Sequence, residues 1–304
     1  MANGEGERSD AEMNVDSSGS RPMPLALGQF GPWFSPVFDD EVRIRMVVEA
    51  EALGFRAAWL GIGRRSMPGL EAVEQTLEAT SSIVVATSVL NMWMNDPDVV
   101  ATSYGRIAER VPGRLLIGLG MGHPEYVPDY RSPYAMMARY LERLDDGGVP
   151  ADGRVLAALG PNTLRLARER SAGSHPYLVG PGHTRMARRV LGAGAILAPE
   201  HTVMVCIEDP PARELAREFL DHPYLHLENY VNNLLRQGFT RGDVAGGGSD
   251  RLVEALVTSG SPDVVAEGLR AHLEAGADHV AVQALTGDGD AMEPFRRLAP
   301  ILLG

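Results

Sequence analysis

The sequence contains no lysine and only one cysteine, Cys206, among its 304 residues. Without a lysine amine the chain cannot form a Schiff base with a carbonyl substrate, which excludes one class of covalent catalysis. A single cysteine also excludes an internal disulfide and a cysteine-based zinc site. Because Cys206 follows the apolar run HTVMV, we expect it to be a buried and inert thiol.

Several further signals are missing. The chain has no HExxH motif, no paired Asp/His spacing and no G-x-S-x-G nucleophile elbow, so we predict no metal site. No apolar run approaches the roughly 20 residues of a membrane helix. Residues 1–23 are acidic and rich in Gly and Ser, without the apolar stretch of a signal peptide. We expect a disordered leader over 1–23, one domain over 24–304 and a cytoplasmic location.

The formal net charge of −12 disfavours a nucleic acid or an anionic membrane as partner, because the surface field would repel either. All 28 basic side chains are arginines, which bind phosphate and carboxylate groups with paired N–H donors. A local group of arginines can therefore hold a small anion despite the negative total. We expect a small-molecule substrate.

Strand and helix patterns alternate along the chain from residue 25 onward. The strand patterns are mostly continuous runs of Val, Ile, Leu and Ala, which indicate burial on both faces and hence a parallel sheet. Eight such units in about 280 residues predict a (β/α)8 TIM barrel; a doubly wound open sheet is the alternative, with fewer strands at this length. The predicted strands cover 25–34, 57–63, 83–93, 114–122, 154–160, 174–180, 196–209 and 278–285.

In a TIM barrel the functional residues stand at the carboxyl ends of the strands. His123 follows the fourth strand and is the candidate proton donor or acceptor, with Glu125 as second choice, although a loop histidine is also commonly a hydrogen-bonded spectator. Arg64, Arg65 and Arg185 are candidates to meet a phosphate or an acidic tail. The predicted substrate pocket consists of Phe30, Trp33, Trp93, Tyr126, Arg64 and Arg185.

The stretch GPNT, residues 160–163, opens the helix after the fifth strand. Gly160 has no side chain to block a ligand, and Pro161 begins a helix without losing a hydrogen bond. Asn162 and Thr163 then offer backbone amides at the positive end of the helix. Most such turns between a strand and a helix bind nothing, so these residues alone leave open whether the segment contacts a phosphate.

Seven segments occur in the order and spacing of the luciferase-like flavin and deazaflavin oxidoreductases and resemble them: GFRAAWLGIG, IVVATSVLNMW with the NDP that follows, RLLIGLGMGH, RVLAALGP, HPYLVGPGHT, ENYVNNLLRQGF and EAGADHVAVQAL. The chain is most similar to the actinobacterial branch that depends on coenzyme F420, over roughly residues 24 to 300. The resemblance independently implies a TIM barrel. The chain departs from the family at Ile62 and Gly63, where several relatives carry Asp-His. The identity of the residue that carries the proton is therefore left open.

The resemblance also implies a cofactor site. TSVLN resembles the family's bulge after the third strand, where a cis peptide between Ser88 and Val89 would back the central ring. AALGPNT resembles the segment that holds the ribityl-phosphate part. The predicted cofactor-binding residues are Ser88, Val89, Asn91, Leu159, Gly160, Pro161, Asn162 and Thr163.

Three functions follow as expectations. The first is hydride transfer between coenzyme F420 and a small organic substrate, with His123 moving the accompanying proton. The second is an FMN-dependent monooxygenase that uses O₂ and reduced flavin from a partner reductase. The third is a flavin-binding barrel without catalysis. We expect a homodimer.

Overall fold

The computed structural model describes residues 25–62, 70–126, 133–206, 211–287 and 289–304. The predicted leader, residues 1–23, lies outside the described residues. So do Arg64 and Arg65, two of the three arginines predicted to meet an anion.

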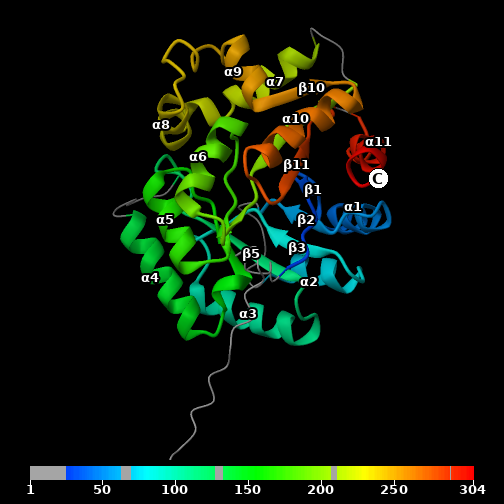
Figure 1. Ribbon diagram of the computed structural model, residues 1–304. Helices are drawn as coiled ribbons and strands as arrows, with labels where there is room; N and C mark the ends of the chain where they lie inside the picture. The colour runs from blue at the N-terminus through cyan, green and yellow to red at the C-terminus, as the bar shows by residue number, and fades with distance from the viewer. Residues whose placement is uncertain (1–24, 63–69, 127–132, 207–210, 288) are drawn as a thin grey trace, which may run out of the picture.

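Parallel strands form the centre of the molecule and occupy eight positions around a barrel, which confirms the predicted fold (Figure 1). The seventh position is shared by two consecutive strands and closes the ring. There the amide of Ala198 donates to the carbonyl of Ser174 at 2.9 Å, and the amide of Ala281 donates to that of Pro199 at 2.9 Å. In barrel order the strands are β1 (Phe30–Phe34), β2 (Ala57–Leu60), β3 (Val84–Thr87), β5 (Leu115–Gly120), β6 (Arg154–Leu156), β7 (Gly173–Ser174), β8 (Ile196–Leu197) with β9 (Glu200–Val205), and β11 (Val280–Ala284).

Helices follow the strands and surround the barrel. They are α1 (Asp40–Ala52), α2 (Glu71–Glu78), α3 (Pro97–Arg110), α4 (Pro133–Asp146), α5 (Pro161–Arg170), α6 (Pro181–Leu191), α10 (Pro262–Glu274) and α11 (Glu293–Leu302), with a short 3-10 turn η1 (Ala151–Gly153). The start of α3 shows why the sequence pattern is informative: Asp96 accepts a hydrogen bond from the amide of Asp98 at 2.9 Å, and Pro97 begins the helix. None of the described helices has the length and apolarity that a membrane crossing requires.

Side chains on each barrel strand alternate between the barrel interior and the surrounding helices. In β2, Ala57 and Trp59 belong to the interior cluster, whereas Ala58 and Leu60 belong to the cluster beneath the helices. Both faces are therefore apolar, which explains the continuous hydrophobic runs. The interior cluster consists of Leu25, Leu27, Trp33, Ala57, Trp59, Val84, Ala86, Leu116, Val155, Ile196, Ala198 and Ala281.

An insertion between the seventh and eighth barrel positions forms a third apolar cluster. It consists of α7 (Pro211–Asp221), the 3-10 turn η2 (Tyr224–His226), α8 (Glu228–Arg236), α9 (Asp250–Leu256) and β10 (Val257–Gly260). These elements gather at one end of the molecule (Figure 1, yellow to orange), where Leu220, Leu234 and Leu252 pack together. Because α7 to α9 pack on their own core, the position of α8 depends on the insertion and not on the barrel alone.

The structure differs from the predicted strands in several places, and also at Cys206. The predicted strand 83–93 breaks after Thr87 and resumes as β4 (Leu90–Asn91), the predicted strand 174–180 shrinks to β7, and β10 was not predicted. Cys206 is exposed and not buried, since the strand β9 ends at Val205 and the chain turns there with a φ of 59° at Cys206.

Candidate active site

The break in the third strand is a bulge whose Ser88–Val89 peptide bond is cis, as the family resemblance implies. The hydroxyl of Ser88 accepts a hydrogen bond from Nε1 of Trp33 at 2.6 Å and lies 2.7 Å from Nε2 of His175. The bulge thus lies at the carboxyl end of the barrel. It is hydrogen-bonded to Trp33 of β1 and to His175, which follows β7.

Beneath the bulge, His175 occupies the barrel interior. Its Nδ1 lies 2.6 Å from the carbonyl of Ala198, which only accepts, so Nδ1 carries the hydrogen and Nε2 accepts from Ser88. The imidazole stacks on Trp59 with ring centroids 4.0 Å apart. Burial lowers the pKa of His175 to about 4, so the ring is neutral near pH 7 and can act as this acceptor.

A cavity of about 490 Å³, here called the rim cavity, opens at this end of the barrel. Seven residues predicted from the sequence line it: Ser88, Val89, His123, Leu159, Gly160, Asn162 and Thr163. Helix α8 covers its other side with residues that the sequence did not single out: Asn229, Tyr230, Asn232 and Arg236. The predicted bulge and the predicted phosphate segment therefore share one cavity.

The start of α5 forms the anion-binding end of the rim cavity. Gly160 is the N-cap and no side chain caps the helix, so its first amides face open space or a ligand. A Cβ built on Gly160 would lie 3.9 Å from the Arg236 guanidinium. A helix N-terminus and a guanidinium converge here on one point, an arrangement that suits a phosphate. Pro161 faces a neighbouring cavity instead.

A second space of about 750 Å³, the central cavity, adjoins the rim cavity. It is lined by Trp33, Asn91 and Tyr126 among the predicted residues. The two cavities share Ser88, Val89, Gly122, His123, Tyr177 and Tyr230, so they form one continuous space with the bulge at its middle.

His123 lies where the two cavities meet. Its Nδ1 is 2.9 Å from Oδ1 of Asn229, and its ring lies 5.4 Å from that of Tyr230. Because the amide oxygen accepts, Nδ1 of a neutral His123 carries the hydrogen and Nε2 remains available to accept a proton. Helix α8 thus sets both the tautomer and the orientation of this histidine.

Glu125 makes a different contact from the one that the sequence suggested. Its Oε1 accepts a hydrogen bond from the backbone amide of Glu228 at 2.8 Å, at the first residue of α8. The side chain is exposed and lines neither the rim nor the central cavity. Glu125 therefore anchors the start of α8.

Three residues predicted for the substrate pocket lie elsewhere. Phe30 is buried beneath the helices, because it is an odd number of positions from Trp33 and so faces the opposite side of β1. Trp93 packs against the same cluster, and Arg185 is exposed on α6. Neither cavity is lined by these three side chains.

Sequence reasoning also missed a partly buried polar cluster beside the central cavity. The hydroxyl of Tyr177 lies 2.9 Å from that of Tyr224 and donates to Gln283 at 2.7 Å. Glu200, fully buried nearby, accepts from the amide of Leu178 at 3.0 Å and from the hydroxyl of Thr202 at 2.8 Å. Burial raises the pKa of Glu200 to about 7. Its neighbours in sequence are ordinary strand residues, so no local pattern marks it.

The sequence predicts no metal site, yet Asp221, His222 and His226 bring one ligand atom each within 4.8 Å of one another. Asp221 ends α7, His222 follows it and His226 ends η2. The two histidine side chains are 77% and 65% exposed, and we assign no ion to them.

Known proteins resemble this chain in part of the sequence and in the fold. Residues 36–147 match the luciferase-like monooxygenase family. No curated protein matches the chain. Among solved structures, an F420-dependent secondary alcohol dehydrogenase in complex with an F420-acetone adduct is 14% identical, with a TM-score of 0.69 over 91% of this chain and 98% of that one.

Two further structures show the same fold. The coenzyme F420-dependent tetrahydromethanopterin reductase from Methanopyrus kandleri is 17% identical, with a TM-score of 0.67 over 91% of this chain and 100% of that one. A type II Baeyer–Villiger monooxygenase from Pseudomonas putida, in complex with FMN, is 18% identical, with a TM-score of 0.68 over 90% and 96% of the two chains. The match over residues 36–147 and the shared TIM-barrel fold agree with the resemblance seen in the sequence.

Proposed function

We propose that this protein is an F420-dependent oxidoreductase that transfers a hydride between C5 of the deazaflavin and a small organic substrate. The observation that carries the proposal is the continuity of the site. The cis bulge at Ser88–Val89 and the anion-binding end at Gly160 and Arg236 line one cavity, as a ligand with a flat ring and a phosphate requires.

The residues present fit such a cofactor. Gly120 of β5 lies against the bulge. A Cβ added at this position would approach Cγ2 of Val89 to 2.7 Å, so the position has to remain without a side chain. At the other end, the amides of α5 and Arg236 offer only donors, which suits the acceptor oxygens of a phosphate. When bound, the cofactor supplies the redox chemistry, while the protein positions it and excludes water.

His123 is the residue we propose to move the accompanying proton. Its Nε2 is left available by the contact of Nδ1 with Asn229, and it stands between the rim and central cavities. The central cavity, walled by Trp33 and Tyr126, would hold the substrate. Tyr177 lines both spaces and is held by Tyr224 and Gln283, so it can shape the boundary between ring and substrate.

Titration of the purified protein with F420, FMN and riboflavin tests the proposal. We expect F420 to bind, and hydride exchange with a panel of alcohols, ketones and enones. Tight binding of FMN without binding of F420, with oxygen consumption when reduced FMN is supplied, would assign the monooxygenase reaction instead. Cofactor binding without turnover on any substrate would assign a non-catalytic barrel.

The variant Arg236→Gln tests the assignment of the phosphate end. A hydrogen bond to a charged group contributes about 1.5–3 kcal/mol, so we expect at least tenfold weaker binding of F420 and FMN. Riboflavin, which lacks the phosphate, should bind as it does to the wild type. Arg241→Gln is the matched control, because Arg241 is exposed and lines neither cavity. An equal loss for riboflavin would contradict the assignment.

A further inference from the structure

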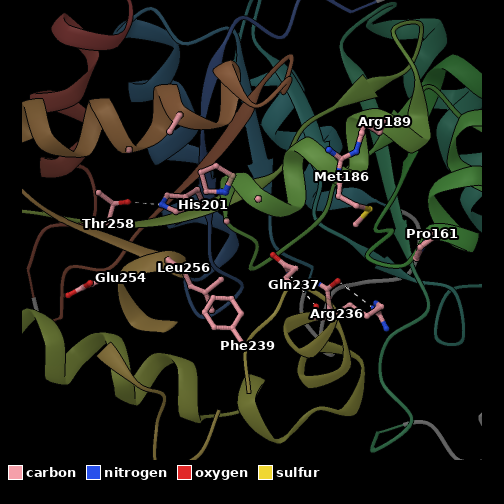
Figure 2. Close-up of a pocket in the computed structure, with 17 residues that line it drawn as sticks. Pro161, Met186, Arg189, His201, Arg236, Gln237, Phe239, Glu254, Leu256 and Thr258 are labelled. Carbon is pink, nitrogen blue, oxygen red and sulfur yellow. Dashed lines mark hydrogen bonds between the residues drawn. The ribbon is translucent and has the colours of Figure 1, made fainter. Parts of the chain in front are cut away.

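A third cavity, of about 780 Å³, adjoins the C-terminal end of α8 (Figure 2). We call it the α6–α8 chamber. It is bounded by the first turn of α6, by α8, by the start of β10 and by α10. Arg236 lines both the chamber and the rim cavity, while Asn233 and Gln237, toward the C-terminal end of α8, line the chamber and not the rim cavity.

One buried polar group in the chamber has no partner among the described residues. Asn233 is 1% exposed, and its Nδ2 makes no hydrogen bond there. Its Oδ1 accepts from Arg236 at 3.5 Å, so the nitrogen is the atom left over. Leaving a buried donor unpaired is unfavourable, and an acceptor atom on a ligand in the chamber would satisfy it.

The chamber also receives the N-terminus of α6, a helix of 11 residues. Gly180 is the N-cap, no side chain caps the helix, and Pro181 is its first residue. A Cβ built on Gly182 would meet no atom within 4 Å, so the space in front of the first turn is open. The positive end of this helix therefore points to a second anion-binding position, distinct from that at α5.

The charged groups around the chamber favour an anion. Arg189 and Arg236 line it, and the carboxylate present, that of Glu254, lies 3.7 Å from Arg213. His201 also lines the chamber, but its Nε2 lies 2.8 Å from the Thr258 hydroxyl, and burial lowers its pKa to about 4. The remaining walls, including Met186, Phe239 and Leu256, are apolar. Donors at one end and apolar walls at the other suit an organic anion.

From these observations we infer that the α6–α8 chamber binds a small organic molecule through a phosphate or carboxylate group, held by the backbone amide of Gly182 at the start of α6, Nδ2 of Asn233 and the guanidinium of Arg236. The inference goes beyond the proposed redox function and does not depend on it. The anionic group can belong to a separate ligand or to an acidic extension of a molecule seated in the rim cavity, since Arg236 borders both spaces.

Calorimetric titration with citrate and with inorganic phosphate tests the chamber directly. The decisive variant is Gly182→Asp, which places a carboxylate at the predicted anion position and, near the positive end of α6, is compatible with folding. We expect at least a tenfold loss of citrate affinity in Gly182→Asp and in Asn233→Leu. Gly194→Asp is the control: it adds the same charge at an exposed glycine with open space and no place in the chamber.

The two sources of the anion are distinguished with cofactors. If F420 displaces citrate, and Gly182→Asp weakens F420 but not FMN, the chamber holds an acidic extension of the rim-cavity ligand. If citrate and F420 bind together, the ligand is a separate molecule. Failure of all flavin binding would refute the proposed function and leave the citrate result intact. Absence of citrate and phosphate binding, or equal citrate affinity in wild type and Gly182→Asp, would overturn the inference.

Discussion

At the scale of single residues, Ser88 joins the functional bulge to the barrel interior. Its hydroxyl accepts from Trp33 and donates to His175, and both partners are buried. His175 in turn stacks on Trp59, whose Nε1 donates to His279 at 2.9 Å. These contacts fix the side chains beneath the proposed ring position. Each polar side-chain atom in the network has a hydrogen-bond partner, as a buried network requires.

The variant Ser88→Ala should therefore lower the stability of the protein. It removes the partner of Nε1 of Trp33 and of Nε2 of His175, and each buried unpaired group costs about 1–3 kcal/mol. We expect the free energy of unfolding, from urea denaturation, to fall by about 2 kcal/mol or more. Ser259→Ala, at an exposed position of β10, should change it by less than about 0.5 kcal/mol. A Ser88 variant as stable as this control would contradict the network.

At the scale of elements, α8 completes the site. It contributes Asn229 to His123, Tyr230 to the shared wall and Arg236 to the anion-binding end, although it lies about seventy residues beyond the start of α5. Its first turn is held by the carboxylate of Glu125, which follows the fourth barrel position. The geometry of the proposed cofactor site thus depends on how this one helix is anchored.

Two substitutions at Glu125 separate anchoring from proton transfer. Gln retains an oxygen that can accept from the amide of Glu228, whereas Ala does not, and loss of a helix-capping acceptor costs about 1 kcal/mol. We expect F420 affinity within about twofold of wild type for Glu125→Gln and about fivefold weaker for Glu125→Ala, measured by fluorescence titration. If Glu125 carried the proton, both variants would lose turnover while binding F420 normally.

At the scale of the whole molecule, buried histidines set the response to acid. Burial lowers the pKa of five of the eight histidines: His175, His183, His201, His272 and His279. For three of them, His175, His201 and His279, the pKa falls from 6.5 to about 4. The unfolded chain then binds more protons than the folded one, so stability is present above pH 6.5 and is lost as pH falls toward 4.

Each of these three shifts corresponds to on the order of 3 kcal/mol, and three together approach the whole stability of an ordinary domain. Glu200 acts in the opposite direction, because its raised pKa contributes stability below about pH 4.5 that is lost as pH rises through about 7. The histidines outnumber it, so we expect cooperative unfolding between pH 6 and 4. Urea denaturation followed by circular dichroism at pH 7, 6 and 5 measures this. A midpoint that does not change from pH 7 to 5 would contradict it.

The features that the sequence predicted are local or repeated. Continuous apolar runs identify strands buried on both faces, and eight of them predict the barrel. Gly160 and Pro161 identify the start of α5, and the motif around Ser88 and Val89 identifies the bulge through resemblance to the family. Each of these depends on a few neighbouring residues or on a regular period, so one chain is enough to reveal it.

Contacts between distant segments were decided only by the tertiary structure. Arg236 and Asn233 belong to one amphipathic helix, α8. The residues next to them in the sequence do not show that Arg236 borders the rim cavity or that Asn233 borders the α6–α8 chamber. Phe30 was assigned to the pocket because it stands at a strand end, but the face of β1 on which it lies depends on the register with β2 and β11. The sequence by itself determined the barrel and the two local motifs, because secondary-structure propensity and the periodicity of buried residues depend on residues close together in the chain. Tertiary packing determined which side chains from distant segments come into contact.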